Sequence, residues 1–180
     1  MNVEGRKISQ EEGRYELKLS VNGVLRSLMV KADAILLDVL RNDLGLTGAR
    51  RGCESNFCGA CTVLLDGQAI HSCSVLALTA NNKSVVTIEG LSQDGKLHPL
   101  QESFIQHGAI QCGYCTPGMI LSAKALLDED PEPAESKIRE SIAGNLCRCT
   151  GYKKIVQSVL AVAQGNQTSI EKWGGCNGAV

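Results

Sequence analysis

Closely spaced cysteines restrict what this chain can fold into more than any other feature of its sequence. Cys53, Cys58 and Cys61 form a C-x4-C-x2-C run within residues 52–66, and an apolar segment follows directly. A fourth cysteine, Cys73, lies a hairpin's length further on. If these four thiols act as one ligand set, the fold has to bring them together around a common centre.

The chemistry of a two-iron cluster explains this spacing. Each iron of a [2Fe-2S] core takes two thiolates, and the plant-type site draws three of its four from one compact loop. The oxidised core with its thiolates carries a net charge of about −2, which a protein accepts only where N–H groups point at the sulfurs. Gly52, Gly59 and Ala60 allow that close approach of the backbone. A C-x2-C pair alone also occurs in zinc knuckles and thioredoxin-like sites, but neither needs a third thiol upstream.

A second group of cysteines lies in the C-terminal half of the chain. It consists of a C-x2-C pair and a C-x-C pair, Cys112 with Cys115 and Cys147 with Cys149. Each pair is followed by a threonine, Thr116 or Thr150, at the predicted start of a helix, and Pro117 is predicted as the first helical residue. We therefore expect two helix N-termini to face these sulfurs and favour their thiolate form. The four thiols can hold a second [2Fe-2S] cluster, and a tetrathiolate zinc site remains the alternative.

Length, charge and composition narrow the remaining possibilities. With 180 residues and nine cysteines in two separated groups, the chain is expected to form two modest domains. No apolar leader and no membrane-spanning run is present, which predicts a cytoplasmic protein whose thiols bind metal instead of forming disulfides. The 18 basic and 19 acidic residues nearly balance and aromatic residues make up only 3%, so nucleic acid is not an expected partner.

The hydrophobic pattern predicts a β-grasp domain over residues 13–89. Alternating apolar residues on both sides of Asn22-Gly23 indicate a hairpin, and a helix and further strands follow it. The predicted strands cover 14–21, 24–30, 62–65, 68–72 and 84–88, and the predicted helix covers 34–43.

Beyond a predicted linker at 90–98 the pattern becomes helical. Helices are expected at 99–106, 116–128, 134–143 and 152–164, and the short connections between them favour a four-helix bundle over 99–164. The segments 1–12 and 165–180 are predicted to be tails. Within the second tail, Trp173 is a candidate anchor on a partner subunit, and Cys176 is interpreted as a spectator thiol.

With both cysteine groups quoted, residues 15–164 closely resemble the small iron–sulfur subunit of the molybdenum hydroxylases. This family includes xanthine dehydrogenase, aldehyde oxidoreductase and carbon monoxide dehydrogenase. The strings at 111–119 and 144–152 carry the most specific part of the resemblance. It implies an α+β fold, with a plant-type ferredoxin-like β-grasp domain followed by a helical [2Fe-2S]-binding domain.

The resemblance also implies roles for individual residues. The ligands of a cluster near the flavin would be Cys53, Cys58, Cys61 and Cys73. The ligands of a cluster near the molybdenum would be Cys112, Cys115, Cys147 and Cys149. Gln111 and Cys149 would touch the pterin. The molybdopterin cofactor is expected on a large partner subunit and FAD on a medium one.

The predicted function is therefore electron transfer by a non-catalytic subunit of an oxidoreductase, with two [2Fe-2S] clusters and no catalytic residue of its own. A free-standing ferredoxin-type carrier and a zinc-stabilised interaction module are the alternatives. Arg50 and Arg51, beside the first cluster, are expected either to raise its potential, to meet an acidic partner surface or to be plain solvated charges. His71, His98 and His107 lack Rieske spacing and are interpreted as surface or packing residues.

Overall fold

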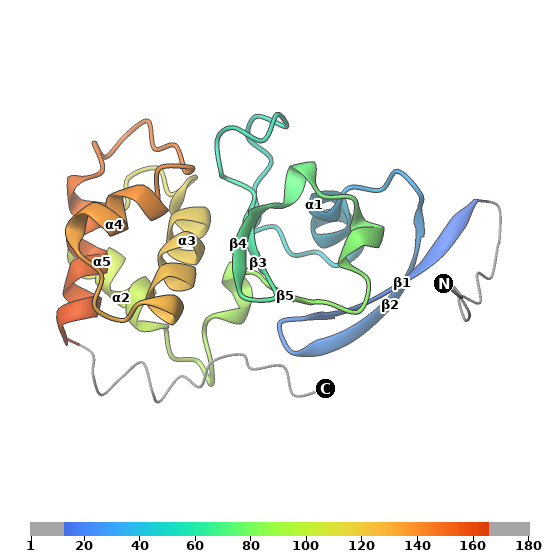
Figure 1. Cartoon of the computed structure of the whole chain (residues 1–180), viewed down its shortest axis with the longest axis horizontal. Helices are drawn as coiled ribbons and strands as arrows, with labels where there is room; N and C mark the ends of the chain where they lie inside the picture. Colours follow the sequence, from blue (N-terminus) through green and yellow to red (C-terminus); the bar gives the residue numbers. More distant parts are fainter. Residues whose placement is uncertain (1–12, 166–180) are drawn as a thin grey trace, which may run out of the picture.

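A five-stranded sheet and a group of helices lie side by side in the computed structural model, which describes residues 13–165 (Figure 1). The predicted tail 1–12 lies outside the described residues, as do residues 166–180 with Trp173 and Cys176.

The predicted hairpin opens the fold. Strands β1 (Arg14–Val21) and β2 (Val24–Lys31) pair antiparallel along their whole length. Asn22 and Gly23 between them have φ values of 51° and 79°, the left-handed conformations that a two-residue type I′ turn requires. One face of β1 is buried, through Leu17, Leu19 and Val21.

Three shorter strands complete the sheet: β3 (Thr62–Leu65), β4 (Gln68–His71) and β5 (Ser84–Val86). The order is β2-β1-β5-β3-β4, with β1 and β5 parallel and the other neighbours antiparallel. The last strand in the sequence is therefore the middle strand of the sheet, where it joins the two hairpins. Short 3₁₀ segments follow β4 and β5 and include η2 (Ser72–Ser74), η3 (Ala77–Ala80) and η4 (Ile88–Gly90).

The helix predicted over 34–43 differs from the observed one. Helix α1 (Leu36–Asp38) continues as the π-helical segment η1 (Val39–Asp43), in which the Leu44 amide donates to the Val39 carbonyl at 3.1 Å. The prediction covered the right segment but missed its π-helical half, because the spacing of its four buried apolar residues fits an ordinary α-helical face. Those four buried residues are Leu36, Leu37, Val39 and Leu40.

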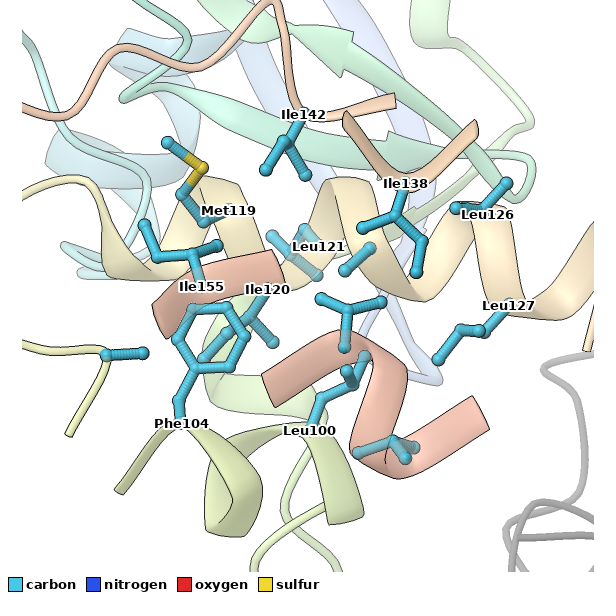
Figure 2. Close-up of a cluster of buried hydrophobic side chains, with 14 of the residues drawn as sticks. Leu100, Phe104, Met119, Ile120, Leu121, Leu126, Leu127, Ile138, Ile142 and Ile155 are labelled. Atoms are coloured by element: carbon cyan, nitrogen blue, oxygen red, sulfur yellow. The ribbon is translucent and has the colours of Figure 1, made fainter. Parts of the chain in front are cut away.

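Four helices make up the rest of the described chain, close to their predicted positions. They are α2 (Pro99–Gln106), α3 (Thr116–Glu129), α4 (Glu135–Ser141) and α5 (Lys153–Gly165). Figure 2 shows their shared core, to which each helix contributes, including Phe104, Met119, Ile138 and Ile155. Among residues 13–165, no helix is both long enough and apolar enough to cross a membrane.

The sheet and the helices share part of one core. Helix α3 packs on β3 and β4, and Leu64 and Val86 from the sheet belong to the same buried cluster as the helical residues (Figure 1). Leu91, inside the predicted linker 90–98, is buried in that cluster too. The connection between sheet and helices is therefore packed against the core, which fixes the position of the cysteine loops on either side.

His98 caps helix α2 from a buried position. Its Nδ1 accepts a hydrogen bond from the Leu100 amide at 3.2 Å, and its own amide donates to Oε1 of Gln101 at 2.8 Å, which completes a capping box. Burial lowers the pKa of His98 to about 4; the charge of Lys124 adds to this and that of Asp128 opposes it. The imidazole is therefore held neutral, the form that can accept the capping hydrogen bond.

We predict that His98 reduces the stability of the protein in mild acid. Histidine in the unfolded chain has a pKa near 6.5, so below that pH the unfolded state binds more protons, and stability falls as the pH drops towards the folded-state pKa of about 4. In His98→Asn the cap acceptor remains but does not titrate. Between pH 7 and pH 5 the free energy of unfolding, measured with urea, should fall by about 1–2 kcal/mol more in the unmutated protein than in His98→Asn. Equal losses in both proteins would contradict the assignment.

Candidate metal centres

The loop before β3 curls around the sulfur of Cys53. Glu54 and Asn56 adopt left-handed conformations, with φ values of 56° and 59°, and so turn successive amides inward. The Sγ atom of Cys53 accepts N–H groups from Ser55, Phe57 and Cys58 at 3.5, 3.4 and 3.3 Å. The Ser55 side chain and these three amides lower the pKa of the Cys53 thiol to about 5. The loop thus stabilises negative charge on sulfur, as an iron–sulfur site requires.

Two further thiols of this first centre are brought together by the β3–β4 hairpin. Cys61 directly precedes β3 and Cys73 follows β4, and the pairing of Thr62 with His71 sets them side by side. The Ser72 hydroxyl donates to the Cys61 carbonyl at 2.7 Å and fixes the two ends. Burial raises the pKa of Cys61 to about 11; the backbone amide of Cys73 opposes this shift and the Cys73 thiol adds to it.

The second centre joins the turn before α3 to the turn between α4 and α5. The thiol of Cys149 donates to the sulfur of Cys112 at 3.6 Å, although the two residues lie on different turns. The amide of Thr150 lies 3.4 Å from the sulfur of Cys147 and its hydroxyl 3.0 Å from it. All four predicted cysteines of this group therefore gather at one end of the helices, with Cys115 completing the set.

The thiols of the second centre differ in how readily they ionise. Burial raises the pKa of Cys115 to about 12, with Cys147 adding to the shift. The Tyr114 amide lowers the pKa of Cys112, and the hydrogen bond to Cys112 raises that of Cys149. Burial acts to raise the pKa of Cys147, but its hydrogen bonds with Thr150, Cys149 and Cys115 together outweigh that effect and lower it. A bound metal would displace the protons that the buried thiols hold at neutral pH.

Both sets of thiols suit a two-iron cluster. In such a cluster each iron takes two thiolates, and in the second centre the thiols interact in pairs, Cys112 with Cys149 and Cys115 with Cys147. In the part of the chain that the structure describes, no three potential ligand side chains gather closely enough for a single metal ion. A two-iron cluster does not need three ligands on one ion.

The two centres are hydrogen-bonded to each other. The Leu146 amide donates to the Cys58 carbonyl at 2.9 Å, so one hydrogen bond separates the loop of the first centre from the loop of Cys147. The buried Asn145 side chain donates to the Gly59 carbonyl at 2.9 Å and to the Thr62 hydroxyl at 3.0 Å. The relative position of the two cysteine sets is therefore fixed by buried polar contacts.

Both halves of the chain match known iron–sulfur families. Residues 19–85 match the 2Fe-2S iron-sulfur cluster binding domain, and residues 87–160 match the [2Fe-2S] binding domain. The small FeS subunit of nicotinate dehydrogenase from Eubacterium barkeri is 49% identical over 146 residues, which cover 81% of this chain and 93% of that protein. The small subunit of nicotine 6-hydroxylase from Paenarthrobacter nicotinovorans is 50% identical, covering 82% and 88%.

Solved structures agree with these relatives. Quinoline 2-oxidoreductase from Pseudomonas putida 86 superposes with a TM-score of 0.82 at 44% identity, covering 86% of this chain and 96% of the matched chain. Aldehyde oxidoreductase from Desulfovibrio gigas gives a TM-score of 0.80 at 43% identity, covering 87% of this chain and 18% of its own. The chain belongs to the iron–sulfur subunits of the molybdenum hydroxylases. As such a subunit it serves electron transfer in an oxidoreductase, as the sequence predicted, and its two halves match [2Fe-2S] binding domains.

The helix starts around the second centre of this molybdenum hydroxylase subunit agree with the prediction only in part. Helix α3 begins at Thr116 as predicted, with Cys115 as its N-cap, but Pro117 is the second helical residue and not the first. Helix α5 begins only at Lys153, so Thr150 is not at a helix start. Instead Thr150 bonds to the sulfur of Cys147, because two left-handed residues, Gly151 at φ 64° and Tyr152 at φ 68°, separate it from α5.

Sequence reasoning did not find the residues that join the two centres of the subunit. Asn145 lies within the string quoted for the family resemblance, but its partners are more than 80 residues away in sequence. Gly118 allows an equally close contact, because a Cβ atom there would lie 2.4 Å from the Gly59 carbonyl oxygen. No local pattern reveals either role.

We predict that Gly118→Ala destabilises the subunit although it improves helix propensity. Alanine within a helix is favoured over glycine by about 1 kcal/mol, but the clash with the Gly59 carbonyl should outweigh this and cost about 1–3 kcal/mol in total. Urea unfolding and the rate at which a chelator bleaches the visible absorption measure both effects. The matched control is Gly165→Ala, where the added Cβ would meet nothing within 4 Å. If Gly118→Ala is as stable as that control, the contact does not constrain the interface.

Proposed function

We propose that this subunit passes single electrons between a molybdenum centre on a partner and a flavin or other acceptor, by way of two [2Fe-2S] clusters. The observation that carries the proposal is the hydrogen bond from the Leu146 amide to the Cys58 carbonyl at 2.9 Å. It links the two cysteine sets through a short path of bonds along which single electrons can pass. Taking up and releasing one electron at a time is the chemistry that two-iron clusters supply when bound.

The chain's own groups would hold the clusters and balance their charge. The first cluster would be bound by Cys53, Cys58, Cys61 and Cys73. The second would be bound by Cys112, Cys115, Cys147 and Cys149. The amides around Cys53 and the Thr150 groups beside Cys147 would stabilise the added negative charge on sulfur.

The domain division that goes with this proposal is a β-grasp domain over 13–89 and a four-helix bundle over 99–164, joined by 90–98. The matched family ranges, 19–85 and 87–160, support a boundary in this region. A reducing, cytoplasmic environment would keep the thiols available for iron.

Two partner subunits complete the proposed path. A large subunit would carry the molybdopterin cofactor, with Gln111 and Cys149 in contact with the pterin; both residues are exposed in this chain. A medium subunit would carry FAD near the first centre, where the Phe57 side chain is 70% exposed. An aromatic ring so open to water, beside ligand cysteines, is suited to packing against another protein.

The relay requires two separate clusters, and we predict that both are detected on reduction. Dithionite should give two distinct [2Fe-2S] EPR signals, with about four irons, about four acid-labile sulfides and no stoichiometric zinc per chain. A single signal would favour a ferredoxin-type carrier with one cluster, and stoichiometric zinc would exclude the second iron site. Co-purification with a molybdenum protein then separates a subunit from a free carrier.

The proposed pterin contact predicts a kinetic effect of Gln111→Ala. Losing one hydrogen bond of about 1.4 kcal/mol would slow substrate-driven cluster reduction in the complex about tenfold, while both clusters stay assembled. Stopped-flow absorbance and EPR measure these two quantities. Gln157→Ala, which changes an exposed glutamine on α5, is the control. Unchanged reduction kinetics in Gln111→Ala would argue against the contact.

A further inference from the structure

Arg50 reaches from the loop of the first centre to the loop of the second. Its position in the sequence is three residues before Cys53, but its Nη1 atom donates to the Gly113 carbonyl at 2.8 Å. Gly113 lies inside the C-x2-C pair of the second centre. The guanidinium carbon also lies 5.2 Å from the centroid of the Tyr114 ring, a cation–π contact that holds it in place.

The neighbouring Arg51 differs in its charge environment. It forms ion pairs with Asp38 and Glu54, so two carboxylates offset its charge, and it is exposed. Arg50 is half-buried, and no carboxylate within residues 13–165 forms an ion pair with it. Its positive charge is therefore uncompensated by any described side chain and less screened by solvent than that of Arg51.

We propose that Arg50 sets the reduction potential of the second centre, the one assigned to Cys112, Cys115, Cys147 and Cys149. The sequence suggested an effect of the arginine pair on the first cluster, but the structure directs the Arg50 charge to the other one. The inference rests on the proposed function, because it requires a cluster at each centre. Arg50 acts here as a positioning charge and is not itself a redox group.

The physical basis is the change in cluster charge on reduction. One electron enters, from the molybdenum centre in the enzyme or from dithionite in a titration, and the cluster with its four thiolates goes from about −2 to about −3. No bond forms or breaks and no proton moves. A fixed positive charge stabilises the −3 state more than the −2 state, so it raises the potential. The hydrogen bond from the Arg50 guanidinium to the Gly113 carbonyl also keeps the Cys112–Cys115 turn against the loop of the first centre.

Three substitutions separate the charge of Arg50 from its hydrogen bond. Arg50→Lys keeps the charge, Arg50→Gln keeps a donor without charge, and Arg50→Met keeps neither. Arg26→Met, on the exposed outer strand β2, is the control for loss of one positive charge. The readout is the midpoint potential of each EPR signal in a dithionite titration of the assembled complex, with the second-centre signal identified as the one altered by Cys112→Ser.

The expected result is a shift of the second-centre reduction equilibrium by about tenfold towards the oxidised form in Arg50→Gln and Arg50→Met. For a one-electron couple a tenfold change is 59 mV more negative. Arg50→Lys should stay within about threefold of the unmutated protein, the first-centre signal should move less, and Arg26→Met should leave both unchanged.

Several results would overturn the inference. One is an equal shift in Arg50→Lys and Arg50→Gln, and another is an unchanged potential in Arg50→Gln while both signals persist. Loss of a cluster in Arg50→Met alone, with normal potentials in the other two variants, would show that Arg50 only holds the two loops together and does not set the potential. Absence of two signals in the unmutated protein would instead overturn the proposed function, so the two failures are distinguishable.

Discussion

The close approach of two backbones, at Gly59 and Gly118, is the contact on which the arrangement of this protein depends. A Cβ atom on Gly118 would lie 2.4 Å from the Gly59 carbonyl oxygen, and one on Gly59 would lie 2.4 Å from the Gly144 carbonyl oxygen. Because neither residue has a side chain, the loop of the first centre can settle directly on helix α3 and on the turn of the second centre. Because the backbones are this close, the Asn145 side chain can donate a buried hydrogen bond to the Gly59 carbonyl.

This packing connects the fold to electron transfer. Helix α3 contributes to the helical core on one side and contacts β3 on the other (Figure 1, Figure 2). Moving the two cysteine sets apart would therefore expose buried apolar side chains to water. A relay of single electrons benefits from such rigidity, because small changes in the distance between redox centres change the rate strongly. Two metal-binding loops joined only by a mobile linker would not keep this distance constant.

The local elements were largely predictable, and the failures have local reasons. The strands around Asn22-Gly23 and the four C-terminal helices follow from side-chain periodicity and turn chemistry. The helix after the first hairpin is partly π-helical, and the apolar spacing did not reveal this because it fits an ordinary α-helical face. Thr150 was misjudged as a helix start, since the left-handed Tyr152 gives no sequence signal.

The sequence by itself identified two candidate sets of thiol ligands, because cysteine spacing within a loop decides which thiols can reach a common centre. It also determined the family, through the strings around both cysteine groups. Only the tertiary structure decided how the two centres face each other. The contacts of Asn145 with Gly59 and of Arg50 with Gly113 join residues far apart in the chain, and such pairings depend on how α3 packs against the sheet, which no local pattern encodes.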